Sequence, residues 1–301
     1  MMAKARIAVV GAGLMGHGIA QVFALAGHEV KITDTVVKNL DTATSRIAAN
    51  LRDLGEDEGA VERVQPSVDL TDAVHDADYV VEAVSENLEL KKKLFAELER
   101  RTRPDTILAS NTSVIPITAI MQDLSRRERA VGTHWWNPPF LVPLVEVIGT
   151  QWTSPQVIAT TMELHAAAGK TPAHVKKDVP GFIGNRLQHA LWREAISLVE
   201  HGICDAKTVD DVVKASFGRR LAVLGPIENA DQVGTDLTLA IHDVVLPAIE
   251  NRPGPSPYLQ ELVANGKLGF KSGEGFQKWS PEQQAALRAR VMRHLKAMRN
   301  T

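Results

Sequence analysis

The sequence predicts a two-part protein: a doubly wound, mostly parallel α/β sheet domain over residues 1–185, followed by an all-α domain over residues 186–301. Three observations support this prediction. Short apolar runs alternate with helical patterns through the first part, a β-α-β rhythm typical of a doubly wound sheet. A glycine-rich turn joins the first run to the first helix. After residue 185 the strand rhythm stops, and only amphipathic helical patterns follow.

The predicted strands are short and rich in β-branched residues. They cover 6–11, 28–34, 78–84, 106–111, 129–135, 144–148 and 173–179. The first helix, 14–27, follows the first strand directly and ends at Gly27. The last helix begins at Ser280 and Pro281, and Gln283 completes a capping box.

Composition and charge exclude several function classes. The 301 residues carry a formal net charge of −2, so no overall field attracts nucleic acid or an anionic membrane. The single cysteine, Cys204, excludes an internal disulfide and fits a reducing compartment. No segment approaches the roughly 18 apolar residues of a membrane span. We therefore expect a cytoplasmic protein without a nucleic-acid or membrane partner. The last helix carries an apolar stripe as well as five basic residues, which are Arg288, Arg290, Arg293, Lys296 and Arg299. This combination indicates a helix that docks through its apolar stripe and leaves its basic face solvated.

The glycine-rich turn has the spacing G-x-G-x-x-G, with Gly11, Gly13 and Gly16 between a buried strand and a helix. In that context the glycines permit a tight turn, close approach of a pyrophosphate, and close packing of helix on strand. Asp34 ends the next strand and can accept hydrogen bonds from both ribose hydroxyls. A carboxylate followed by Thr35 favours NAD over NADP. The sequence thus predicts a Rossmann-type site for NAD formed by Asp34 and the whole turn, including Leu14 and Met15.

His134 and Glu146 form a second candidate site. His134 lies at the end of a predicted strand, where doubly wound sheets bind ligands, and Glu146 lies in the apolar run "PLVEVI". A buried carboxylate is costly unless it is paired, and an imidazole partner resolves this cost. Such a pair can remove a hydroxyl proton while NAD accepts the hydride. A purely structural histidine remains an equal alternative. No third ligand stands at metal-binding spacing, so no metal is expected.

Several motifs in order also resemble the L-3-hydroxyacyl-CoA dehydrogenase family, over essentially the whole chain. They are "GAGLMGHGIA", "VVEAVSENLELKKKLF", "ILASNTS", "HWWNPP…PLVEVI", "KDVPGFIGNRL", "GPIENADQVGTD" and "LGFKSGEGFQKW". This family includes 3-hydroxybutyryl-CoA dehydrogenases and the lambda-crystallin-like L-gulonate 3-dehydrogenases. The resemblance implies oxidation of a 3-hydroxy to a 3-oxo group with NAD, as in fatty acid metabolism, and a homodimer formed through the helical domain, which also contributes to the substrate cleft.

The resemblance also implies roles for individual residues. His134 and Glu146 match the family's catalytic pair. Ser113 matches the serine that hydrogen-bonds the substrate hydroxyl and lies beside the cofactor, and Asn185 matches an asparagine that holds the reacting oxygen. Three further positions match cofactor or active-site contacts: Glu86, Lys91 and Asn137.

Departures from the family bear on the substrate. Members that act on acyl-CoA carry a longer helical hairpin with lysines that meet CoA, where this chain has a short segment containing Glu56, Asp57 and Glu58. The double proline and the segment "GFIGNRLQHALWREAISLVEHGI" resemble more closely the branch that oxidises free hydroxy acids or a pyridine carboxylate. The substrate is therefore either a 3-hydroxyacyl-CoA or a related free acid. A non-catalytic, crystallin-like NAD-binding protein is a further alternative, which predicts loss of the His–Glu pair.

Overall fold

The computed structural model describes residues 4–299, which fall into two compact units. The first unit contains the chain up to Arg186 and also the segment from His294 onward, and the second is Leu187–Arg293. The sequence assigns the whole last helix to the helical domain, whereas the end of this helix groups with the sheet. No helix among the described residues is long and apolar enough to cross a membrane.

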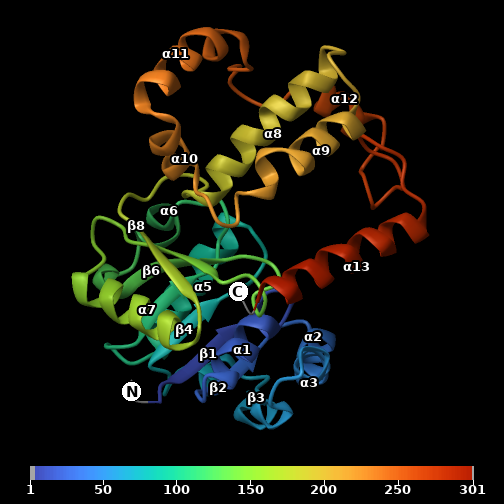
Figure 1. The fold of residues 1–301 in the computed structure, drawn as a ribbon. Helices are drawn as coiled ribbons and strands as arrows, with labels where there is room; N and C mark the ends of the chain where they lie inside the picture. Colours follow the sequence, from blue (N-terminus) through green and yellow to red (C-terminus); the bar gives the residue numbers. More distant parts are fainter. Residues whose placement is uncertain (1–3, 300–301) are drawn as a thin grey trace. The chain divides into compact units, whose positions relative to one another are not determined.

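An eight-stranded sheet forms the centre of the first unit, in the order β3-β2-β1-β4-β5-β6-β7-β8 (Figure 1). Its strands are β1 (Arg6–Val10), β2 (Glu29–Thr33), β3 (Val64–Pro66), β4 (Tyr79–Glu82), β5 (Ile107–Ser110), β6 (Ala130–Trp135), β7 (Leu144–Ile148) and β8 (Thr171–Val175). Neighbouring strands are parallel except β6 and β7, which are antiparallel. The predicted fold class is confirmed.

Helices cover both faces of this sheet (Figure 1). One face packs against α1 (Gly16–Leu25), α3 (Ala43–Leu54) and α7 (Pro155–Ala167), and the other against α4 (Leu70–Val74), α5 (Leu88–Arg101) and α6 (Ile117–Met121). Because both faces are buried, the central strands are continuous apolar runs instead of alternating ones. The shorter elements of this unit are α2 (Val37–Asp41), η1 (Glu58–Arg63) and η2 (Arg127–Arg129).

The bounds of six strands agree with the sequence prediction within two residues, and two strands differ by more. The edge strand β3 is not predicted, because its three residues, which include Pro66, show no apolar alternation. The last strand begins at Thr171 and ends at Val175, so the residues from Lys176 to Val179 lie outside the sheet. The polar run at 176–178 leaves the sheet where its side chains reach solvent.

The second unit is built from helices, and its first and last helices begin or end in the first unit. They are α8 (Gly184–Glu200), α9 (Ala206–Ala215), η3 (Phe217–Arg219), α10 (Pro226–Val233), α11 (Thr235–Val245), η4 (Leu246–Ala248), α12 (Pro257–Ala264) and α13 (Pro281–Met298). The capping box predicted for the last helix is present. The Gln283 amide donates to Ser280 Oγ at 3.2 Å, and the Ser280 amide donates to Gln283 Oε1 at 2.8 Å.

Candidate active site

The glycine turn lies at the carboxyl end of β1. Gly11 has a φ of +106°, and a Cβ atom there would lie 2.5 Å from the Ala83 carbonyl oxygen. A Cβ at Gly16 would lie 1.6 Å from the Gly11 carbonyl oxygen, so neither position tolerates a side chain. A Cβ at Gly13 would meet nothing within 4 Å. The backbone at Gly13 therefore faces open space, where a phosphate group can approach the start of α1.

Asp34 follows β2 and is held in place by donors from three directions. One carboxylate oxygen accepts from the Ala12 amide at 2.7 Å and from Asn39 Nδ2 at 3.2 Å, and the other accepts from the Val36 amide at 2.8 Å. A cavity of about 490 Å³ lies beside the carboxylate. Apolar side chains line much of it: Val36, Val68, Leu70, Ala83, Val84, Leu90 and Leu94.

This cavity fits the adenosine half of NAD. The Val68 and Val36 side chains are 85% and 52% exposed, so they offer apolar surface to a flat base beside the carboxylate of Asp34. Of the two residues inside the turn, Leu14 is exposed, whereas Met15 packs against the core. The apolar lining is not among the sequence-predicted residues, because isolated aliphatic residues after strands carry no pattern that distinguishes them from the core.

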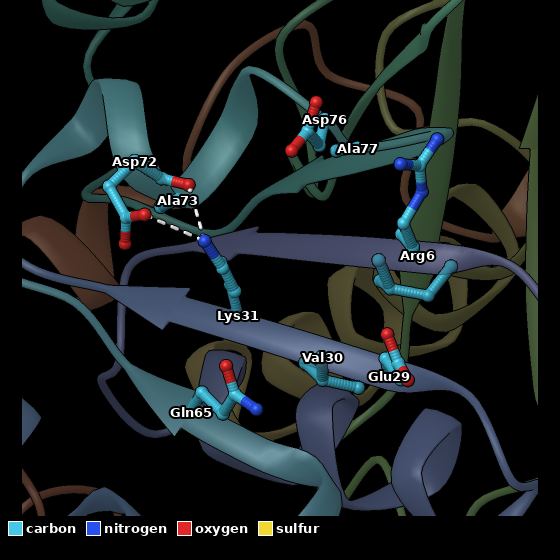
Figure 2. Close-up of a pocket in the computed structure, with 10 residues that line it drawn as sticks. Arg6, Glu29, Val30, Lys31, Gln65, Asp72, Ala73, Asp76 and Ala77 are labelled. Atoms are coloured by element: carbon cyan, nitrogen blue, oxygen red, sulfur yellow. Dashed lines mark hydrogen bonds and ion pairs between the residues drawn. The ribbon is translucent and has the colours of Figure 1, made fainter.

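A smaller cavity of about 180 Å³ lies at the opposite, amino-terminal ends of β1 and β2. Figure 2 shows Lys31 on β2 directed at Asp72, with the ammonium 2.7 Å from the carboxylate. Arg6 pairs with Asp78 at 3.0 Å. Because both cations pair with neighbouring carboxylates, this cavity offers no unpaired cation for an anionic ligand, and it lies away from the glycine turn.

His134 and Glu146 face each other across β6 and β7, where the antiparallel register pairs them directly. His134 Nδ1 lies 2.7 Å from Glu146 Oε2. Both side chains are buried, with exposed fractions of 4% and 1% for the two residues. The imidazole also contacts the rings of Trp136 and Phe182, at centroid distances of 5.4 and 5.7 Å. The buried glutamate therefore has the imidazole partner that the sequence predicts.

The second oxygen of Glu146 binds the start of α8. It accepts hydrogen bonds from the Ile183 and Gly184 amides at 2.8 and 3.0 Å. Burial opposes ionisation of this carboxyl, but the hydrogen bonds from His134 and these two amides outweigh it and hold its pKa below the usual value. An ionised carboxylate only accepts, so Nδ1 of His134 is the donor in this hydrogen bond, and in the neutral ring the lone pair then lies on Nε2.

Asn185 and Ser113 are also brought together. Asn185 Nδ2 donates to the Ser113 carbonyl oxygen at 2.9 Å, and the Ser113 amide donates to Glu86 Oε1 at 3.0 Å. The same glutamate oxygen accepts from the Thr112 hydroxyl at 2.6 Å and from the Val114 amide at 3.1 Å. Burial would raise the pKa of Glu86, but these donors and the nearby Lys91 ammonium lower it. Glu86 thus holds the loop after β5 in one conformation.

Lys91 lies beneath this loop, in a cluster that the sequence reasoning missed. Its ammonium is 2.6 Å from Glu82 Oε1 and 3.5 Å from Glu86 Oε2, with the lysine side chain 1% exposed. The Ser110 hydroxyl donates to the other Glu82 oxygen at 2.6 Å. A direct contact between Lys91 and a cofactor remains a prediction, since the buried ammonium here serves the two glutamates. The signal for Glu82 is present in the sequence: a carboxylate in the buried run "DYVVEAV".

Asn137 stands apart from these hydrogen bonds. It is exposed in the loop after β6, and the structure of residues 4–299 gives its side chain no hydrogen bond to the other predicted site residues. Over the same residues, no group of three or more His, Cys, Asp or Glu side chains is arranged to hold a metal ion. The predicted residues therefore form an acid–base pair on β6 and β7 and a hydrogen-bonded loop after β5, and the glycine turn follows β1.

Comparison with known protein families gives two matches that together cover nearly the whole chain. Residues 6–179 match the NAD binding domain of 3-hydroxyacyl-CoA dehydrogenase, and residues 181–279 match its C-terminal domain. A 5-formyl-3-hydroxy-2-methylpyridine 4-carboxylate 5-dehydrogenase of Mesorhizobium japonicum is 38% identical, with 97% of this chain and 96% of that protein covered. A probable 3-hydroxybutyryl-CoA dehydrogenase of Deinococcus radiodurans is also 38% identical, with 91% and 100% covered.

Solved structures show the same two kinds of relative. The crystal structure of a 5-formyl-3-hydroxy-2-methylpyridine 4-carboxylic acid 5-dehydrogenase, described as an NAD⁺-dependent dismutase, superposes with a TM-score of 0.92 at 37% identity, covering 99% of this chain and 98% of that one. The (S)-3-hydroxybutyryl-CoA dehydrogenase of Ralstonia eutropha superposes with a TM-score of 0.77 at 32% identity, covering 92% and 100%.

Proposed function

The chain belongs to the 3-hydroxyacyl-CoA dehydrogenase family, and within this family we propose that it oxidises a free carboxylic acid instead of a coenzyme A thioester. It is an NAD-dependent oxidoreductase acting on CH–OH groups, so the predicted family, enzyme class and cofactor are confirmed. The proposed substrate is a small pyridine or other aromatic carboxylate whose oxidisable carbon carries a hydroxyl, as an alcohol or a hydrated aldehyde.

The observation that carries this proposal is the similarity of the whole chain to the pyridine-carboxylate enzyme. The TM-score of 0.92 over 99% of the chain exceeds the 0.77 over 92% obtained with the acyl-CoA enzyme. Since fold alone does not fix function, a second and local observation is needed.

The segment after α3 supplies this second observation. The sequence predicts that a CoA phosphate finds little attraction in this acidic segment, and in the structure Glu56 of the segment and Asp53 near the end of α3 are paired. Lys296 Nζ lies 2.6 Å from Asp53 Oδ2, and Arg299 forms an ion pair with Glu56. These cations come from the end of α13 and are engaged by carboxylates instead of being available to a CoA phosphate. The charge distribution therefore favours a substrate without a CoA moiety.

The His134–Glu146 pair suits the proton transfer of this oxidation. When bound, NAD supplies the acceptor for the hydride that leaves the carbinol carbon. Glu146 orients the imidazole through Nδ1, so that Nε2 can accept the hydroxyl proton, and the carboxylate stabilises the imidazolium that results. The C–H electron pair leaves with the hydride and the O–H proton moves to His134, so the step is balanced.

Ser113 and Asn185 are proposed to hold the reacting oxygen. Their contact through the Ser113 carbonyl brings the two residues together from the loop after β5 and the start of α8. Glu146 binds the amides directly before Asn185, so the base and the proposed oxygen-binding group share one anchor. Ser113, Glu86, Lys91 and Asn137 are proposed to contact the nicotinamide half of the cofactor or to support these contacts.

We also propose a homodimer and a cytoplasmic location. Of residues 187–293, only Ser197 and Leu262 are buried, whereas large apolar side chains are exposed, among them Ile227 at 74% and Leu239 at 63%. Such an apolar surface fits a second copy of the chain. The location rests on the single cysteine and the balanced charge.

Oxidation of a 3-hydroxyacyl-CoA, and with it a place in fatty acid metabolism, is the second candidate. It is supported by the Deinococcus relative, whose identity of 38% equals that of the pyridine-carboxylate enzyme.

Two matched substrate panels decide between these candidates. Purified protein and NAD are assayed for NADH formation on free acids, which include pyridine carboxylates with hydroxymethyl or formyl groups, L-gulonate and L-3-hydroxybutyrate. The second panel holds (S)-3-hydroxyacyl-CoA esters of increasing chain length. We expect turnover on the free acids, with the aromatic carboxylates preferred. Efficient turnover on the thioesters alone would overturn the proposal and establish the second candidate.

A further inference from the structure

The loop of residues 136–143 joins the strand of His134 to the strand of Glu146 and carries Asn137. Three of its residues are prolines, which have no amide hydrogen to donate. Within the loop, the Leu141 and Val142 amides both donate to the Pro138 carbonyl oxygen at 3.0 Å. The carbonyls of Pro139 and Val142 therefore depend on donors from outside the loop, because buried carbonyls need a partner.

Lys170 supplies these donors. Its Nζ lies 2.5 Å from the Pro139 carbonyl oxygen and 2.8 Å from that of Val142. The same ammonium stands 5.4 Å from the ring centroid of Trp135, the buried residue next to His134. Lys170 is itself held in the turn between α7 and β8, where its amide donates to the His165 carbonyl oxygen at 3.0 Å.

The other side of the loop rests on α1. A Cβ atom at Gly18 would lie only 3.0 Å from Pro139 Cδ and 3.3 Å from the ring of Phe140. Because α1 begins at the glycine turn, the loop lies between the helix that starts the cofactor site and the ammonium of Lys170. Movement of this loop would therefore disturb both β6, the strand that carries His134, and the contact with α1.

The charge of Lys170 is not neutralised by a carboxylate. In the part of the chain that the structure describes, no Asp or Glu forms an ion pair with it. Burial, and then the nearby Arg299, lower the pKa of Lys170 to about 8. Arg299 is itself paired with Glu56. Two buried histidines lie on the packed helices: His165 on α7, whose pKa burial lowers to about 4, and His17 on α1, whose pKa burial also lowers.

We propose that Lys170 is a positioning residue for the redox reaction, whose ammonium group holds the loop of residues 136–143 so that His134 keeps its catalytic orientation. This inference rests on the role proposed above for His134. The charged form of Lys170 makes stronger hydrogen bonds to the Pro139 and Val142 carbonyls than the neutral amine does, so the loop is held best when Lys170 is protonated.

Four variants test this inference. Lys170→Met removes the ammonium, Lys170→Arg keeps a charge that does not titrate, and Lys176→Met is a matched control that removes an exposed lysine six residues further on. His134→Gln serves as the reference for loss of the base. The readouts are kcat for NADH formation from pH 6 to 10, NAD affinity by calorimetry, and hydrogen exchange of the loop peptide.

We expect Lys170→Met to lower kcat about tenfold to a hundredfold, the loss typical of a misplaced catalytic group, with NAD affinity nearly unchanged and faster exchange in the loop. Lys170→Arg should retain most activity at neutral pH. The ratio of wild-type kcat to Lys170→Arg kcat should be constant in acid and fall above about pH 8, as the lysine loses its proton. Taking the ratio removes the pH dependence that the reaction itself contributes.

A kcat for Lys170→Met equal to that of Lys176→Met would overturn the inference, as would a loss of thermal stability with kcat retained. If Lys170→Met does not fold, the ratio of wild type to Lys170→Arg still decides, because a ratio independent of pH contradicts the inference. Loss of activity in His134→Gln without loss in Lys170→Met overturns this inference alone. Full activity in His134→Gln overturns the proposed base and this inference with it.

Discussion

Two glutamates, Glu82 on β4 and Glu146 on β7, are both buried in the sheet and both bound to a side-chain nitrogen, which belongs to a lysine in one case and to a histidine in the other. Each is buried in an apolar strand, and each accepts hydrogen bonds at both carboxylate oxygens. Glu82 is paired with the ammonium of Lys91 at 2.6 Å, and Glu146 with the imidazole of His134 at 2.7 Å.

The difference between the two partners distinguishes a structural pair from a pair that can transfer a proton. The ammonium of Lys91 has donors and no lone pair to offer, so its pair with Glu82 supports the loop after β5. An imidazole exchanges a proton near neutral pH, and with Nδ1 occupied by Glu146 its other nitrogen can act on a substrate. A buried carboxylate alone therefore does not identify a catalytic site, and the kind of base opposite it does.

The largest effect is expected from His134→Gln, which removes the titratable partner. Turnover should fall by about 10²–10⁴-fold, the usual contribution of a general base, with NAD affinity nearly intact. Steady-state NADH formation and calorimetric NAD binding measure the two quantities. Activity close to that of wild type would mean that His134 is a structural residue.

Glu82→Gln is expected to lower the free energy of unfolding without a direct effect on the catalytic step. The change removes the 2.6 Å ion pair and leaves the buried Lys91 ammonium only the longer contact of 3.5 Å to Glu86, which costs up to about 3–5 kcal/mol of unfolding free energy. Denaturant unfolding measures it. Replacing both residues, as Glu82→Gln with Lys91→Met, is the matched control and should lose less than the single change. An unchanged midpoint in the single variant would contradict the structural role of this pair.

A smaller effect, confined to the cofactor, is expected from Asp34→Ala, which leaves both glutamates intact. Loss of charge-assisted hydrogen bonds to the ribose should weaken NAD binding by about tenfold and relax the preference against NADP. Cofactor titrations with NAD and NADP measure the change, and kcat at saturating NAD should be close to wild type. Unaltered selectivity would show that Asp34 does not read the ribose.

The smallest effect is expected from Lys296→Gln, which breaks an exposed ion pair and provides the contrast to the buried pair of Glu82 and Lys91. Asp53 and Lys296 are exposed enough for solvent screening, so at most about 1 kcal/mol of unfolding free energy should be lost. Thermal unfolding measures it. A loss as large as that of Glu82→Gln would mean that burial does not separate the two pairs.

The sequence predicts Glu146 correctly as a buried residue because "PLVEVI" surrounds a carboxylate with apolar neighbours, and a histidine ends the preceding strand. The same reasoning applies to "DYVVEAV", yet the partner of Glu82 is harder to recognise. Lys91 is one of three consecutive lysines. Only its spacing to the buried Phe95 and Leu98, four and seven residues later on α5, indicates that it faces the core.

Ion pairs between residues far apart in the chain are not predicted by sequence patterns. The basic face of the last helix is predicted to be solvated, and the prediction does not contain the two ion pairs that the structure shows there, of Lys296 with Asp53 and of Arg299 with Glu56, each across 243 residues. No local pattern encodes such a contact. The sheet, by contrast, follows from local apolar runs and the glycine turn: the edge strand β3 is not predicted, the bounds of β8 differ by up to four residues, and the bounds of the other strands differ by at most two.

The central claim is that Glu146 acts on the reaction only through His134, and a double-mutant cycle tests it most directly. The kcat/KM of wild type, His134→Gln, Glu146→Gln and the double variant is measured at saturating NAD. If Glu146 serves only to orient the imidazole, the double variant is about as slow as His134→Gln alone, because residues that act as a unit are not additive. If the two losses multiply, Glu146 acts independently of the histidine, and the account of this pair is contradicted.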